Sequence, residues 1–83
     1  MNLIYAYPAE RGRGVEAEIV GTLRDRFGPV VQTAREERAA QRAGRTDVVV
    51  TLTVGDDRAD ATLGALRAHP LVIDAARSSG ERV

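Results

Sequence analysis

Residues 47–57 read DVVVTLTVGDD, and this stretch decides the fold class that the sequence predicts. Between Asp47 and Gly55 the side chains alternate, so two sets point to opposite sides of an extended backbone. The wholly apolar set consists of Val48, Val50, Leu52 and Val54. The mixed set consists of Val49, Thr51 and Thr53. We therefore expect a central strand that buries its even-numbered residues against helices and leaves its other face open.

A second helix is expected directly after this strand. Asp56 or Asp57 provides its N-cap, and Asp60 lies in the first turn, where the helix dipole favours negative charge. Pro70 ends the helix, because proline cannot continue the backbone hydrogen bonding. The chain then continues as a last strand over residues 71–76.

The N-terminal part predicts a strand, a loop and a helix. Residues 3–7 are apolar and aromatic and are bounded by Pro8, which is typical of a strand, and residues 9–14 form a loop. Apolar residues then recur every four positions along one face of an amphipathic helix: Val15, Ile19, Leu23 and Phe27. Gly28 and Pro29 end this helix, since glycine takes the left-handed cap position.

The segment between the first helix and the central strand is less regular. Residues 30–33 begin an extended segment, but residues 35–43 (REERAAQRA) favour helix by local propensity. They lack the large apolar residues that would anchor a helix to a core. We interpret residues 34–43 as the outer, solvated arm of a hairpin that turns around Gly44.

The resulting order is strand, helix, strand, strand, helix, strand. It predicts an α+β ferredoxin-like βαββαβ sandwich: a four-stranded antiparallel sheet with two helices on one face. We expect a single domain over residues 1–77 and a flexible C-terminal tail over residues 78–83.

The second half, VVVTLTVGDDRADATLGALRAHPLVIDAAR, resembles the closing half of ACT-type regulatory domains. There, alternating valines lead through an acidic cap into a helix, and a "leucine, x, x, His/Leu-Pro, x, Val" step enters the last strand. The resemblance implies a domain that dimerises and binds a small metabolite such as an amino acid. The first loop departs from the family, because ERGRG (residues 10–14) replaces the Asp-Arg-Pro-Gly common in ACT domains.

Composition excludes several function classes. The chain has twelve basic and twelve acidic residues and no lysine or cysteine, and its arginine usage is typical of a GC-rich bacterial genome. Because acids alternate with the arginines, we expect no nucleic-acid partner. No apolar run reaches the ~18 residues of a membrane span, so we expect a cytoplasmic protein without a membrane partner. With one histidine, His69, no metal and no cofactor are expected.

The candidate ligand site is the loop before the first helix. It consists of Arg11, Gly12, Arg13 and Gly14. Free backbone N–H groups at a helix start favour anions, and arginines add charge-assisted hydrogen bonds to a carboxylate or phosphate. An ordinary turn that needs glycine for its backbone remains the alternative. If the domain binds a small carboxylate, this loop is the expected place.

The candidate interface is the open face of the sheet. It consists of Leu3, Tyr5, Tyr7, Val49, Thr51 and Thr53. Tyrosines on an uncovered face would suit packing against a second copy, so we expect a homo-oligomer. Ile4 and Ala6 would then face the helices. The inverted arrangement, with the tyrosines in the core, is the alternative.

The leading functional hypothesis is a non-enzymatic regulatory or interaction module that dimerises through its sheet and binds a small anionic metabolite. No catalytic residue is assigned. One alternative is a small dimeric α/β-barrel enzyme with a substrate cavity between two sheets, whose candidates are Tyr5, Tyr7, Arg35 and His69. Another is a subunit-assembly domain without a ligand.

Overall fold

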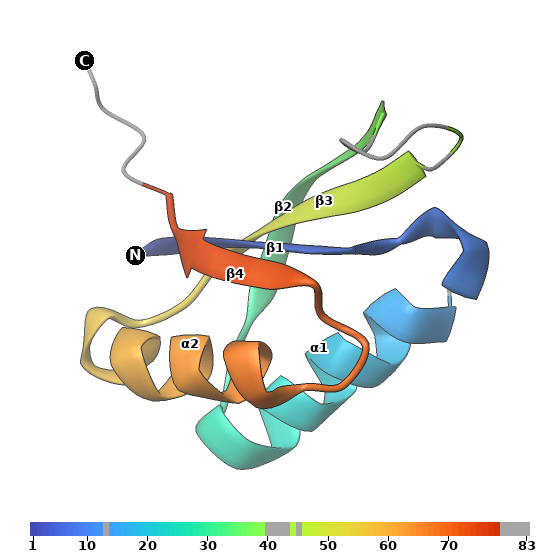
Figure 1. The fold of residues 1–83 in the computed structure, drawn as a ribbon. Coiled ribbons are helices and arrows are strands. Elements are labelled where there is room, and N and C mark those ends of the chain that lie inside the picture. Colours follow the sequence, from blue (N-terminus) through green and yellow to red (C-terminus); the bar gives the residue numbers. More distant parts are fainter. Residues whose placement is uncertain (13, 40–43, 45, 79–83) are drawn as a thin grey trace.

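The computed structural model describes residues 1–12, 14–39, 44 and 46–78, which form an α+β domain. In chain order, the elements are β1 (Asn2–Pro8), α1 (Gly14–Phe27), β2 (Val31–Ala39), β3 (Thr46–Thr53), α2 (Ala59–Ala68) and β4 (Asp74–Arg77). The described strands form one antiparallel sheet in the order β2-β3-β1-β4. Both helices lie on one face of this sheet (Figure 1). The predicted four-stranded sheet with two helices is confirmed.

The pairing of β1 with β3 determines which side chains enter the core. Tyr5 lies opposite Val50 in this antiparallel pair, and Tyr7 lies opposite Val48. Residues directly opposite each other point to the same face of a sheet. All the even-numbered apolar residues of the predicted central strand are buried, as expected: Val48, Val50, Leu52 and Val54. The odd-numbered residues of β1 therefore join them beneath the helices.

The predicted orientation of β1 is wrong. Leu3, Tyr5 and Tyr7 are at most 1% exposed and belong to the core, whereas Ile4 and Ala6 lie on the open face. The alternation within β1 separates two sets of residues, but only the cross-strand register assigns a set to a face. Burial of two aromatic rings against the helices removes far more apolar surface from water than burial of Ile4 and Ala6 would.

Helix α1 matches its prediction closely. It begins one residue before Val15 and ends at Phe27. Gly28 has φ +87°, and its N–H donates to the carbonyl of Arg24 in the capping position that favours glycine. The Arg24 guanidinium donates twice to the carbonyl of Val30, at 3.2 Å each, and so holds the following loop against the helix end.

Helix α2 begins differently from its prediction. Asp56 and Asp57 do not cap it, because Asp56–Arg58 form a 3-10 turn and the helix starts at Ala59 without a side-chain cap. Asp56 instead pairs with the N-terminal ammonium at 3.0 Å. Asp60 lies in the first turn as predicted, and it forms an ion pair with Arg77 on β4.

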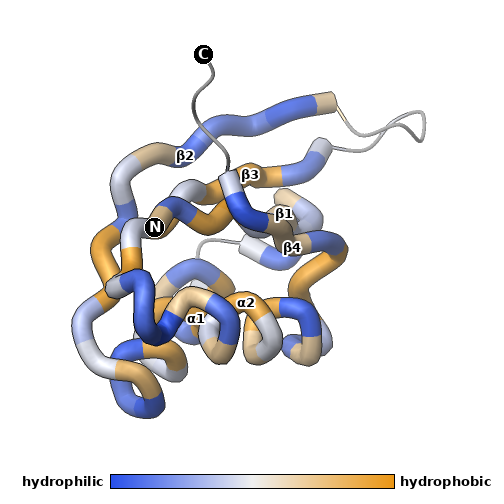
Figure 2. The backbone as a smooth tube through the Cα atoms, turned by 90° about the vertical axis from the view of Figure 1, so that its left-hand side faces the viewer, coloured by the Kyte–Doolittle hydropathy of each residue, from blue (hydrophilic) through white to orange (hydrophobic). Residues whose placement is uncertain are grey.

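Strand β2 is an edge strand that water reaches on both faces. All nine of its residues are exposed, and Figure 2 shows hydrophilic colour along much of its length. The predicted solvated hairpin arm is thus confirmed for residues 34–39, while residues 40–43 lie outside the described part of the chain. A register shift between Gln32 and Ala34 marks a β-bulge near its start.

The last strand is shorter than predicted. Residues 71–73 belong to a turn, in which the N–H of Val72 donates to the carbonyl of His69. Leu71 and Val72 nevertheless pack against the core, so their apolar side chains are explained by packing and not by membership of a strand. Beyond β4, the N–H of Ser78 donates to the carbonyl of Asn2, and the rest of the predicted tail, residues 79–83, is outside the described ranges.

Substitutions of Gly28, at the end of α1, and Gly21, within it, test whether each position needs glycine for its backbone conformation. Gly28→Ala should lower the free energy of unfolding by about 1–2 kcal/mol, because an L side chain is strained in the left-handed region. Its Cβ would also meet the end of the Arg58 guanidinium, which would have to move aside. Gly21→Ala is the matched control: nothing lies within 4 Å of its added Cβ. In a helix interior this change should stabilise by about 0.5–1 kcal/mol. Urea denaturation of both variants tests the pair, and equal effects would contradict the assigned cap.

Candidate functional site

At the middle of the open face of the sheet, the two central strands contribute uncharged side chains. Val49, Thr51 and Thr53 lie half-buried on this face, as predicted for them. Their neighbours from β1 and β4 are not the predicted tyrosines but Ile4, Ala6 and Ala76. Two shallow hollows of about 160 and 240 Å³ lie on this face, and both are lined by Ile4, Val49 and Arg38.

Charged side chains stand at the edges of this open face. On β2, Arg38 donates to the Glu36 carboxylate at 2.8 Å, and both side chains are well exposed. The hydrogen bond from Arg38 lowers the pKa of Glu36. On the opposite edge strand, Asp74 lies across from Ala6. Sequence analysis missed Glu36 and Arg38, although opposite charges two residues apart on a strand share a face.

A polar cluster lies on the other side of the sheet, between β1, α1 and β2. The Tyr7 hydroxyl donates to the Glu16 carboxylate at 2.5 Å, and the Arg35 Nε donates to the same oxygen at 2.7 Å. Gln32 donates to the second oxygen of that carboxylate at 3.1 Å. The Glu16 side chain is only 13% exposed. One carboxylate from the first turn of α1 thus ties the helix to two strands.

Burial and hydrogen bonding shift the pKa values of the groups in this cluster. Burial alone would raise the pKa of Glu16, but the hydrogen bonds from Tyr7, Arg35 and Gln32 outweigh it and leave this pKa below its ordinary value. Burial, followed by the hydrogen bond to Glu16, raises the pKa of Tyr7. The hydrogen bond to Glu16 raises the pKa of Arg35. The cluster therefore holds an ionised carboxylate and a neutral phenol at neutral pH.

Tyr5 lies beside this cluster without joining it. Its ring stacks on that of Tyr7, with 6.3 Å between the centroids. Its hydroxyl is buried and has no hydrogen-bond partner within the described part of the chain. Burial, and then the charge of Glu16, raise the pKa of Tyr5. A phenol in this position stays protonated and closed off from solvent.

The predicted anion loop has an ordinary backbone role in the structure. Gly12 has φ +84°, and its N–H donates to the carbonyl of Ala9. Arg11 and Gly14 are exposed, and Arg13 lies outside the described residues. Glu16 already supplies a negative charge to the first turn of α1. Ligand binding at this loop stays a prediction, and the positive φ of Gly12 shows why the turn needs glycine.

His69 follows the end of α2, far along the chain from the polar cluster. The backbone N–H of His69 donates to the carbonyl of Leu66, and the ring Nδ1 accepts from the backbone N–H of Leu71 at 3.1 Å. Neutral His69 therefore carries its proton on Nε2, which lies 3.5 Å from the Glu18 carboxylate. The imidazole organises the turn between α2 and β4.

The structure brings together three of the four candidates of the enzyme alternative, but not on the open face. Tyr5 and Tyr7 are core residues on the helix side, and the Arg35 side chain is directed to Glu16 there. His69 lies at the end of α2. These side chains therefore do not line a cavity formed by two open sheet faces.

The described residues offer no metal site and no membrane-spanning helix. Among the described residues, no group of three or more histidine, aspartate or glutamate side chains is placed to hold a metal ion. No helix in the ranges described here is long and apolar enough to cross a bilayer. No protein-family model matches the chain, and a comparison with curated proteins gives no match.

Removal of the hydroxyl should change the stability of the protein differently at the two tyrosines. Tyr7→Phe removes one donor from the partly buried Glu16 carboxylate and should lower the free energy of unfolding by about 1–3 kcal/mol. Tyr5→Phe removes a hydroxyl that has no partner in the described residues and should be neutral or stabilising. Urea denaturation at neutral pH measures both. A larger loss for Tyr5→Phe would show that the two hydroxyls are wrongly assigned.

The polar cluster around Glu16 should make the free energy of unfolding depend on pH in the acidic range. Because the folded-state pKa of Glu16 is depressed, its contribution is fully present above the unfolded pKa of about 4.3. It is lost as the pH falls through the folded-state pKa. Glu16→Gln should therefore be less stable than wild type at neutral pH, and this difference should shrink as the pH falls below the unfolded pKa of a glutamate.

The control for this pH dependence is Glu10→Gln, an exposed glutamate in the turn before α1. It should follow the wild-type stability profile at every pH. Urea denaturation across the acidic range measures all three proteins. A Glu16→Gln difference that does not change with pH would contradict an ionised Glu16.

Proposed function

We propose that this domain is a non-enzymatic interaction module that pairs with a second copy of itself through the open face of the sheet. The observation that carries the proposal is the uncharged centre of that face, formed by neighbouring residues of the two central strands: Ile4, Ala6, Val49, Thr51 and Thr53. Protein interfaces combine such a centre with a polar rim.

The charges at the rim suit a second copy of the same chain. Glu36 and Arg38 carry opposite charges on one face of β2. In a two-fold dimer the same patch faces itself, so each partner's acid can meet the other's base. A strongly acidic or basic partner would meet one matching and one repelling charge at this edge.

The strand order and the helix placement support a ferredoxin-like fold. Within it we propose an ACT-like regulatory module, on the sequence resemblance of residues 48–77. In that role the chain would transmit the binding of a small carboxylate to the state of its dimer. The alternative of an enzyme with a cavity between sheets has less support, because its candidate residues lie on the helix side.

The mass of the protein in solution tests the proposed dimer. Light scattering at micromolar concentration should give twice the 8.9 kDa chain mass. Val49→Lys should shift this mass to that of a monomer, because two buried lysines would meet at the centre of the interface. The fold should survive, since Val49 lies opposite Glu36 in the sheet and a lysine there faces an acid.

The matched control is Ala17→Lys, which adds the same charge at an exposed position of α1. It should leave the mass unchanged. Circular dichroism confirms that both variants are folded. A monodisperse wild-type monomer, or equal masses for wild type and Val49→Lys, would reject the proposed interface.

A further inference from the structure

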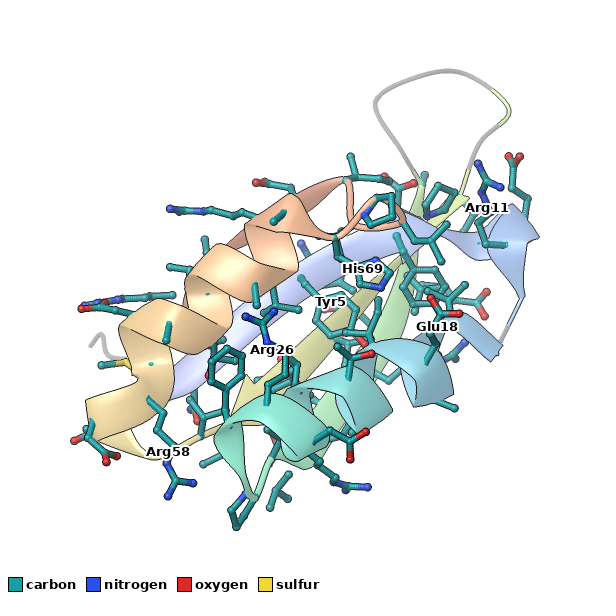
Figure 3. The ribbon with its side chains drawn as sticks, turned by 90° about the horizontal axis from the view of Figure 1, so that it is seen from below. Tyr5, Arg11, Glu18, Arg26, Arg58 and His69 are labelled. Carbon is teal, nitrogen blue, oxygen red and sulfur yellow. The ribbon has the colours of Figure 1, made fainter. Side chains whose placement is uncertain are left out.

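A groove runs between the two helices, on the side of the molecule opposite the open sheet face. Its volume is about 230 Å³. The floor consists of buried apolar side chains: Ile19, Leu23 and Leu66. Figure 3 looks onto this side and shows Arg26 and His69 between the helices. None of these residues takes part in the proposed dimer.

The two ends of the groove differ in charge. Arg26 marks one end of the groove. Ile19, on its floor, lies seven residues earlier on α1, which is about 10 Å along the helix axis. The Arg26 guanidinium lies 5.0 Å from the centre of the Phe27 ring and has no acidic partner within the described chain. The His69 end is next to the Glu18 carboxylate. One end is therefore cationic, and an exposed acid outside the lining stands beside the other end.

Few polar atoms line the groove, and one of them is the Thr22 hydroxyl. The Thr22 hydroxyl already donates to the carbonyl of Glu18 at 2.9 Å, so its oxygen is left to accept. Most of the remaining lining is apolar, including Ala65 and Pro70. A concave, mostly apolar surface with a few polar groups and one charged side chain is the usual composition of a small-ligand site.

We propose that this groove binds a small amphipathic monocarboxylate. The carboxylate pairs with Arg26, and a short apolar body lies along Ile19, Leu23 and Leu66 towards His69. Glu18 repels a carboxylate at the other end, so the charges orient the ligand in one direction. The groove is smaller than the roughly 300–1,000 Å³ of sites for drug-sized molecules, which limits the body to a few carbons.

Titration with sodium hexanoate, followed by ¹⁵N–¹H correlation spectra at constant ionic strength, tests this site. The amide signals of Ile19, Leu23, Leu66 and His69 should shift and saturate. Hexanamide, which keeps the apolar body and lacks the charge, should bind at least fivefold more weakly. Arg26→Gln should weaken hexanoate binding by a similar factor and leave the spectrum folded, because Arg26 is exposed.

Two matched pairs of variants locate the ligand. Arg11→Gln removes another exposed arginine, from the loop before α1, and should not change hexanoate affinity. Ala65→Leu fills the groove and should abolish binding, whereas Ala61→Leu, at an exposed position of α2 outside the lining, should not. Shifts that gather at residues 10–14 and vanish in Arg11→Gln would overturn the groove in favour of the loop. Unsaturable shifts, or equal affinity in Arg26→Gln, would overturn it outright.

Discussion

The register between β1 and β3 is the constraint on which the rest of the structure depends. With Tyr5 opposite Val50, both tyrosines enter the layer beneath the helices. A slip of one residue would move Ile4 and Ala6 into that layer and expose both aromatic rings. The same register leaves the open face with small and β-branched side chains. One pairing thus sets the core, the position of the polar cluster and the character of the surface proposed for dimerisation.

The polar cluster shows how the core accommodates a phenol at its edge. Tyr7 reaches Glu16 at the start of α1, and Arg35 neutralises that carboxylate from β2. The hydrogen bonds outweigh the unfavourable burial of Glu16, so the pKa of this group stays below its ordinary value. Because all residues of β2 are exposed, the hydrogen bonds of Gln32 and Arg35 to Glu16 help to hold this strand to the helix layer. A single glutamate in a helix's first turn therefore joins three elements.

Local patterns in the sequence predicted the elements, and the structure shows where such patterns stop being informative. The apolar face of α1, the break at Gly28 and the buried set of β3 follow from periodicity and backbone preference within one segment. The face of β1 depends on a partner some fifty residues away, and alternation is symmetric between the two choices. Glu16 was missed for the same reason: its role depends on Tyr7 and Arg35, which only tertiary packing brings near it.

The distribution of polar groups bears on what this domain can do. Tyr7, Glu16 and Arg35 satisfy one another, and His69 is held by the turn after α2. Such groups stabilise the fold, and proton transfer to a substrate would require breaking these hydrogen bonds first. Arg26 differs, because it stands beside an apolar floor with no acid paired to it among the described residues. This contrast is why we propose binding, through the open sheet face and the groove behind it, as the activity of the domain.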